Sequence, residues 1–244
     1  MACWFITGCS TGIGREIASA ALEAGHSVAV TARNTGSVAD FADRFGDRAL
    51  VLPLDVTDRE QITAAVSAAE SAFGGIDVLV NNAGYGYMAA VEEGDDAEVR
   101  KLFDTNYFGA VDTLKAVLPG MRDRRHGHVI NISSMTGLVA NPPNAYYSST
   151  KFALEALTEA LVSVLRGAAT TAENATAAAM SRAALADSMA QRASMLRAPG
   201  ARHGLPEDVS ATIEAACGEV LRIRSSVPAF LKKALPPVGP TKRG

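Results

Sequence analysis

The chain has 244 residues, of which 48% are hydrophobic and 6% aromatic, and its formal net charge is −3. Because nucleic-acid binding needs basic surfaces and aromatic rings for base stacking, this composition predicts no nucleic-acid partner. The chain has no apolar stretch of about 20 residues that would span a bilayer, and its scattered cysteines and histidines lack metal-ligand spacing, so we expect a cytoplasmic protein with neither a membrane partner nor a metal site.

Short apolar runs alternate with amphipathic stretches over the first two thirds of the chain. The runs are rich in Val, Ile and Leu and are predicted to be strands buried on both faces: 3–7, 27–31, 49–54, 76–80 and 128–132. The stretches between them have helical periodicity, and each stops at a glycine or proline: 13–24, 37–45, 58–73 and 98–118. This alternation predicts an α/β fold, with a Rossmann-like doubly wound parallel sheet and helices on both faces.

The pattern changes after a further predicted helix at 146–165. Residues 167–208 contain no Val and no Ile and are dominated by alanine, a composition that favours helix over a buried strand. We predict a single domain over residues 1–235, in which 1–165 form the core and 166–205 an alanine-rich helical segment. The proline-rich residues 236–244 are predicted to be a disordered tail.

The first predicted strand ends in a glycine-rich turn that leads directly into a helix. Glycine lets the backbone approach a phosphate, and the N–H groups at a helix start are suitable donors to it. We therefore predict a phosphate-binding loop formed by Gly8, Ser10, Thr11, Gly12, Ile13 and Gly14.

Two other classes of protein use similar turns. Arg15 follows Gly14 where a P-loop has its lysine, which excludes that class. Ser10 also matches the GxSxG turn of serine hydrolases, but several strands precede the serine in those proteins. A serine hydrolase is therefore only a distant alternative.

Tyr147 and Lys151 lie four residues apart at the start of the helix at 146–165, so both project from one helix face. Tyrosine is a poor acid–base catalyst at neutral pH, but a neighbouring cation favours its phenolate. Ser133 and Ser134 follow the strand at 128–132, at the sheet edge where open α/β folds bind ligands. These residues predict a site for proton transfer.

Together the motifs resemble the short-chain dehydrogenase/reductase family. They are TGCSTGIG at 7–14, NNAG at 81–84, the asparagine of FDTNYFG, the serine of NISSMTG and YSSTK at 147–151. The resemblance implies an oxidoreductase that interconverts a secondary alcohol and a ketone by hydride transfer, with this small molecule as its partner.

The resemblance also implies a role for each catalytic residue. Tyr147 would exchange a proton with the substrate oxygen, and Ser134 would hydrogen-bond that oxygen. Lys151 would bond the nicotinamide ribose and favour the Tyr147 phenolate. Asn106 would stabilise a kinked helix and a water that leads from Lys151 to solvent.

The end of the second predicted strand bears on the choice of cofactor. A carboxylate there usually holds the ribose 2′-hydroxyl of NAD, whereas Arg33 would pair with a 2′-phosphate, so NADP(H) is favoured over NAD(H). Arg33 as an exposed loop residue is the alternative. The resemblance further implies that five residues line the cofactor, although turn or cap chemistry would also account for them: Asp55, Val56, Asn81, Ala83 and Gly84.

The resemblance ends after the helix at 146–165. Family members continue with a sixth strand, which is missing here or replaced by residues 218–225 or by the alanine-rich helix, unless the C-terminal third is not a natural continuation of the core. A catalytically impaired nucleotide-binding protein is therefore the alternative function. Because the family associates through its long central helices, we expect a homodimer or homotetramer.

Overall fold

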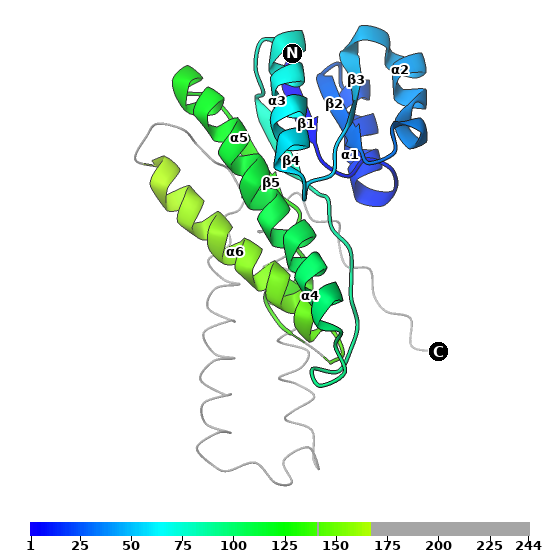
Figure 1. The fold of residues 1–244 in the computed structure, drawn as a ribbon. Coiled ribbons are helices and arrows are strands. Elements are labelled where there is room, and N and C mark those ends of the chain that lie inside the picture. The colour runs from blue at the N-terminus through cyan, green and yellow to red at the C-terminus, as the bar shows by residue number, and fades with distance from the viewer. Residues whose placement is uncertain (141, 167–244) are drawn as a thin grey trace, which may run out of the picture. The chain divides into compact units, whose positions relative to one another are not determined.

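The structure, a computed structural model, describes residues 1–140 and 142–166, which belong to one compact unit. Five parallel strands form a single sheet in the order β3-β2-β1-β4-β5 (Figure 1). They are β1 (Cys3–Ile6), β2 (Ser27–Ala32), β3 (Ala49–Pro53), β4 (Val78–Asn81) and β5 (His128–Asn131). The strands predicted from the sequence are confirmed, with bounds that differ by one or two residues.

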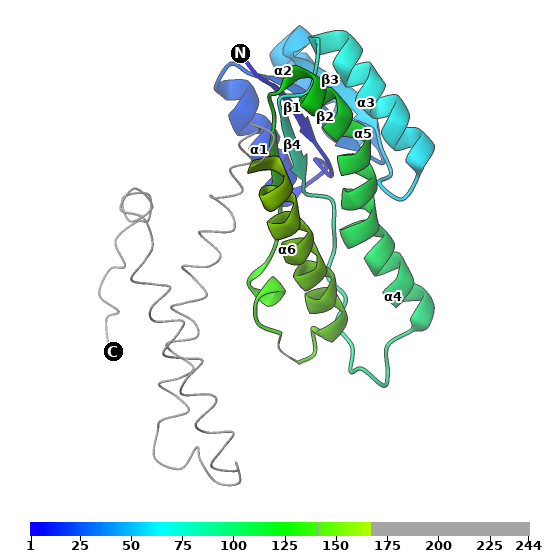
Figure 2. The ribbon, with the colours of Figure 1, turned by 90° about the vertical axis from the view of Figure 1, so that its left-hand side faces the viewer.

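Helices connect consecutive strands and cover both faces of the sheet (Figures 1 and 2). They are α1 (Gly12–Glu23), α2 (Asp40–Phe45), α3 (Arg59–Phe73), α4 (Asp96–Phe103), α5 (Gly109–Arg124) and α6 (Ala145–Arg166). Shorter turns are the 3₁₀ helices η1 (Thr35–Val38), η2 (Gly46–Arg48) and η4 (Met135–Gly137) and the π-helical turn η3 (Asp104–Phe108). The Rossmann-like doubly wound fold is thus as predicted.

Two apolar cores lie on opposite faces of the sheet, because successive side chains of a strand point to opposite sides. Phe5 packs with residues of α3 and α5 on one face. Its neighbour Ile6 packs with residues of α1 and α2 on the other. Both side chains are fully buried, so β1 has the continuous apolar sequence that a two-sided strand requires.

The parallel register brings the carboxyl ends of all five strands to one edge of the sheet. From β1 the chain builds outward through β2 and β3 and then returns to place β4 on the other side of β1. The loops after β1 and β4 therefore leave the sheet side by side and lead to α1 on one face and to α5 on the other. Ligands of open α/β sheets bind at such a point.

One predicted helix end is wrong. The helix expected to stop at Pro119 and Gly120 continues as α5 to Arg124. Met121, beyond the proline, is 1% exposed, and the Arg124 guanidinium donates a 2.7 Å hydrogen bond to the Ile76 carbonyl. These contacts of the last turn outweigh the hydrogen bond that an exposed proline removes.

Two other helical predictions differ in detail. The helix predicted at 37–45 is divided into η1 and α2. The helix predicted from residue 98 begins at Asp96, after the Asp95 carboxylate accepts hydrogen bonds from the N–H groups of Ala97 and Glu98. Predictions for residues 167–244, including the alanine-rich helix, the replaced sixth strand and the disordered tail, lie outside the described residues. No helix in the described part of the chain is long and apolar enough to cross a membrane.

Candidate active site

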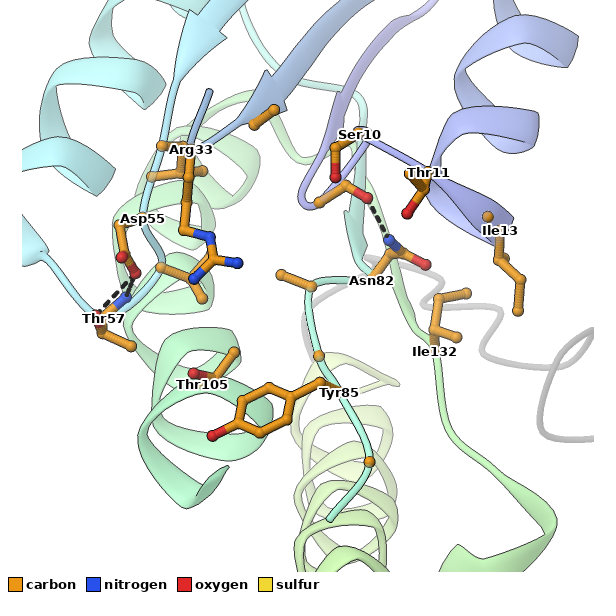
Figure 3. A pocket seen from close by; sticks show the side chains of 18 of the residues that line it. Ser10, Thr11, Ile13, Arg33, Asp55, Thr57, Asn82, Tyr85, Thr105 and Ile132 are labelled. Atoms are coloured by element: carbon orange, nitrogen blue, oxygen red, sulfur yellow. Dashed lines mark hydrogen bonds between the residues drawn. The ribbon is translucent and has the colours of Figure 1, made fainter. Parts of the chain in front are cut away.

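A cavity of about 970 Å³ opens at the carboxyl edge of the sheet (Figure 3). Its volume is at the upper end of the range for ligand pockets, about 300–1,000 Å³. The residues predicted to hold a cofactor all line this cavity, except Gly14 and Asn81. Of the predicted catalytic residues, Tyr147 and Lys151 line it, whereas Asn106 and Ser134 do not.

The glycine-rich loop after β1 is clamped to the loop after β4. The Thr7 hydroxyl oxygen accepts 3.0 Å hydrogen bonds from the N–H groups of Asn82 and Ala83, and Asn82 Nδ2 donates to the carbonyls of Thr7 and Gly8. Gly8 has a φ of +74°, and a Cβ there would lie 2.9 Å from the Cα of Ala83. Only glycine therefore permits this close approach of the two loops.

The start of α1 presents backbone donors toward the cavity. Thr11, at the N-cap position, makes no side-chain capping bond to the N–H groups of the first turn. Gly12 follows with a φ of +61°, and nothing lies within 4 Å of the place a Cβ would take. An uncapped helix start with open space before it is suited to bind an anion.

Gly14 and Asn81 have structural positions outside the cavity, which differs from their predicted contact with a cofactor. A Cβ on Gly14 would collide with Asn82 Nδ2, so this glycine serves the packing of α1 against the sheet edge. Asn81 ends β4 and its side chain is hydrogen-bonded to Asn131 in the protein interior. Its neighbour Asn82, part of the same NNAG motif, lines the cavity instead.

Arg33 and Asp55 occupy one end of the cavity, where β2 and β3 end (Figure 3). Arg33 is exposed and forms no ion pair with any residue in the described part of the chain. Asp55 Oδ1 accepts hydrogen bonds from the N–H and the hydroxyl of Thr57, at 2.9 and 2.8 Å. Asp55 therefore belongs both to a capped turn and to the cavity wall, while Arg33 is an available cation.

Other cavity residues were not predicted as site residues. Lys101, Asp104 and Thr105 come from α4 and η3, far from the motifs in sequence. The ring of Tyr85, in the loop after β4, points toward Thr105 and away from Ile132 (Figure 3). Asn82 and Tyr85 had a signal in the sequence, since Asn82 lies inside NNAG and Tyr85 follows it directly.

Tyr147 and Lys151 come from the first turns of α6. Lys151 Nζ lies 5.7 Å from the centre of the Tyr147 ring and donates a 2.7 Å hydrogen bond to the Ile132 carbonyl. Lys151 is 5% exposed, and its burial lowers the pKa of the amine to about 8, an effect opposed by the Glu155 carboxylate. The Tyr147 hydroxyl has no hydrogen-bond partner among the described residues, so it is available to a ligand.

Ser133 and Ser134 occupy different environments. Ser133 lines the cavity, and its hydroxyl oxygen is buried without a hydrogen-bond partner in the described residues. The Ser134 hydroxyl oxygen accepts hydrogen bonds from the N–H and the hydroxyl of Thr136, at 3.2 and 3.1 Å. These bonds leave the hydroxyl proton of Ser134 available for donation.

Asn106 links three segments around the site. Its side chain accepts from the Tyr85 N–H and donates to the Tyr85 carbonyl, at 3.0 and 2.8 Å, and Nδ2 also donates to the Thr150 hydroxyl of α6. Asn106 is 1% exposed and lies in the π-helical turn η3, between α4 and α5. π-helical turns often occur at functional sites.

Comparison with known proteins identifies the family. The family model described as short chain dehydrogenase matches residues 2–193. The chain belongs to the short-chain dehydrogenase family. It is 42% identical over 152 residues to oxidoreductase BOA17 of Botryotinia fuckeliana, a match that covers 62% of this chain and 56% of the relative.

Solved structures of short-chain dehydrogenases agree with this assignment. A short-chain dehydrogenase from Streptomyces avermitilis is 41% identical, with a TM-score of 0.68, and the match covers 70% of this chain and 63% of the other. The structure of ElxO with NADP bound is 30% identical, with a TM-score of 0.66, and the match covers 69% of this chain and 70% of the other. The chain spans about half the length of the curated relatives it matches.

The cavity has the features that a nicotinamide dinucleotide needs. The open space before Gly12 and the uncapped start of α1 suit a pyrophosphate. Arg33 supplies an unpaired cation at one end, and Tyr147 and Lys151 line the same cavity. Among the residues described, no group of three His, Cys, Asp or Glu side chains could hold a metal ion.

Proposed function

We propose that this chain interconverts a secondary alcohol and a ketone, with NADP(H) preferred over NAD(H). The observation that carries the proposal is that Tyr147, Lys151, Arg33 and the glycine-rich loop line one cavity. A tyrosine and a lysine on one helix are common, but their position beside the glycine-rich loop favours a catalytic role.

The cofactor would be held mainly by backbone donors and by Arg33. N–H groups at the start of α1 would bind the pyrophosphate. The Arg33 guanidinium would pair with a 2′-phosphate in the bidentate way that suits its planar shape. The similar structure of ElxO with NADP bound supports this choice. When bound, the nicotinamide supplies or accepts the hydride.

The protein would supply the proton. Tyr147 would donate its phenolic proton to the carbonyl oxygen during reduction and take it back from the alcohol during oxidation. Lys151 has a pKa lowered to about 8, so near pH 7 it is mainly a cation beside that ring. Ser134 would donate its free hydroxyl proton to the same oxygen, because Thr136 occupies only its acceptor sites.

A protein that binds the nucleotide without catalysis is the second candidate. It is favoured by Ser134, which does not line the cavity. The distant serine hydrolase alternative gains no support, because Ser10 is not hydrogen-bonded to any histidine of the described chain.

The test combines cofactor titration with two variants in which a tyrosine is replaced by phenylalanine. NADPH and NADH are titrated by fluorescence, and a panel of ketones and secondary alcohols is screened for turnover. Tyr147→Phe is expected to lower kcat by about 100-fold or more, the usual range of acid–base catalysis, with NADPH affinity unchanged. The neighbouring Tyr146→Phe is the matched control, because the Tyr146 hydroxyl donates to the Val91 carbonyl and lies outside the cavity.

Each outcome selects one candidate. Turnover that survives Tyr147→Phe at full rate would show that the proposed proton transfer is wrong. NADPH binding by the unaltered protein with no turnover over the whole panel would favour the non-catalytic candidate.

A further inference from the structure

A chain of buried hydrogen bonds joins the neighbouring strands β4 and β5 to α6. Asn81 Nδ2 donates to Asn131 Oδ1 at 2.9 Å, and Asn131 Nδ2 donates to the Thr158 hydroxyl at 2.8 Å. Thr158 in turn donates to the Leu154 carbonyl at 2.7 Å. The three polar residues are only 5–8% exposed. The chain therefore runs through the interior from β4 to β5 to α6.

Its two asparagines occupy matched positions. Asn81 and Asn131 are the last residues of β4 and β5 and are paired in the register of the sheet. The loops that form the cavity wall begin directly after them, at Asn82 and Ile132. The chain thus starts at the strand ends from which the cavity is built.

The residue directly after β5 holds α6 at a second point. Lys151 Nζ donates to the carbonyl of Ile132, the residue after Asn131. Lys151 and Thr158 are seven residues apart, which is two turns or about 10.5 Å along a helix. Two bonds at this separation fix both the rotation of α6 and its sliding along the end of β5.

The two bonds that join α6 to the end of β5, through Lys151 and through Thr158, differ in whether a ligand can reach them. Lys151 lines the cavity, so its ammonium is shared between the protein and any ligand. Thr158 does not line the cavity and bonds only to the protein interior. Apolar packing by Leu154 and Leu157 is not directional and tolerates small shifts, whereas hydrogen bonds weaken steeply with misalignment. Of the two attachments to the end of β5, the one that stays constant when a ligand binds is therefore the one through Thr158.

We propose that Thr158, through its bond from Asn131, is a positioning residue that holds Tyr147 and Lys151 at their place in the cavity. Asn81 belongs to the same hydrogen-bond chain and orients the Asn131 side chain. This inference rests on the proposed function, because the placement of α6 matters only if Tyr147 and Lys151 act in the proposed reaction.

The test uses Thr158→Val with two companions. Valine keeps the shape of threonine and removes the hydroxyl that joins Asn131 to α6. Thr158→Ser restores the hydroxyl. Thr113→Val is the matched control, because Thr113 is likewise buried in a helix and donates at 2.8 Å to the carbonyl four residues earlier, that of Gly109.

Binding of two ligands distinguishes a loss of positioning in Thr158→Val from a general loss of stability. 2′,5′-ADP carries the adenine half of the cofactor and would meet the glycine-rich loop and Arg33, whereas NADPH would also meet Tyr147 and Lys151. Thr158→Val is expected to leave the Kd of 2′,5′-ADP unchanged while it weakens NADPH binding about tenfold and lowers kcat about tenfold, since misplacement by 1 Å costs up to about 100-fold. Thr158→Ser is expected to recover both values, and Thr113→Val to lower only the melting temperature.

The failures are distinguishable. If Thr158→Val lowers only the melting temperature, with NADPH binding and kcat as in Thr113→Val, the positioning role is overturned and the proposed function stands. If the unaltered protein binds neither 2′,5′-ADP nor NADPH, the proposed function is overturned and the inference with it.

Discussion

Lys151 is a buried cation with few compensating contacts. It is 5% exposed and donates one described hydrogen bond, to the Ile132 carbonyl. Glu155, one helical turn further along α6, is 8% exposed and raises the pKa of this amine, but desolvation dominates and the pKa falls to about 8. Because a buried charge without a close partner costs stability, its presence is best explained by what it does in the cavity.

Lys151→Met is expected to stabilise the protein at pH 7 by about 3 kcal/mol, since the Lys151 pKa falls from 10.5 to about 8 and each unit of pKa corresponds to about 1.4 kcal/mol. Between pH 8 and about 10.4, the folded protein has lost the Lys151 proton while the unfolded chain still holds it. The unaltered protein therefore gains stability as the pH rises through this window, and the advantage of the variant shrinks. Urea unfolding of both proteins at pH 7, 8, 9 and 10 measures the difference.

Groups that titrate in both proteins cancel in this comparison. A difference in unfolding free energy that stays constant from pH 7 to pH 10 would contradict the lowered pKa of Lys151. The Lys151→Met variant should bind the cofactor more weakly than the unaltered protein, because it lacks the cation that would bond the ribose.

The sequence predicted residues in the cavity well where a motif fixes their geometry. Tyr147 and Lys151 share a helix face at a spacing of four, and both line the cavity. The sequence could not separate Asn81 from Asn82, or Ser133 from Ser134. Consecutive residues at the end of a strand point to opposite sides, and which side faces the ligand depends on register that a motif does not contain.

At the scale of an element, α5 shows how tertiary contacts override a local signal. Proline and glycine at 119 and 120 predict a helix end, yet α5 continues for another turn. The gain lies in contacts that the sequence pattern does not reveal, the burial of Met121 and the bond from Arg124 to Ile76. The helix ends instead at Arg124 and is followed by Arg125, which has a left-handed φ of 51°.

Pro119→Ala is expected to raise the free energy of unfolding by about 1–3 kcal/mol. Pro119 lies in the interior of α5 on its exposed side, where alanine restores the N–H and removes the clash with the preceding turn. Urea unfolding of the variant measures the gain. NADPH affinity should not change, because Pro119 does not line the cavity.

The adjacent glycine provides a matched control. In an open helix Gly120→Ala would gain about 1 kcal/mol, but a Cβ at this position would lie 2.6 Å from Glu70 Oε1. Glu70 would have to move away from Arg124, so the gain should be smaller than that of Pro119→Ala. A loss of stability in Pro119→Ala would show that the fixed φ of proline supports the last turn.

At the scale of the whole molecule, the alternation of strands and helices was enough to predict a parallel sheet. The strand order was not readable in the same way, because it depends on which strand pairs the chain brings together after long crossovers. That order places the loops after β1 and β4 together and adds Lys101, Asp104 and Thr105 to the cavity. Residues so distant in sequence share no pattern that would reveal their proximity.

A ligand that binds only the folded molecule raises its stability, by about 2.7 kcal/mol at a concentration of 100 times Kd. NADPH is therefore expected to raise the melting temperature more than NADH at equal concentration, because only NADPH has the 2′-phosphate for Arg33. A tenfold difference in Kd corresponds to about 1.4 kcal/mol, or a few degrees for a chain of this size. Arg33→Ala should equalise the two shifts, whereas Arg44→Ala, outside the cavity, should preserve their difference. Equal shifts in the unaltered protein would contradict the preference for NADP(H), and the absence of any shift would contradict cofactor binding itself.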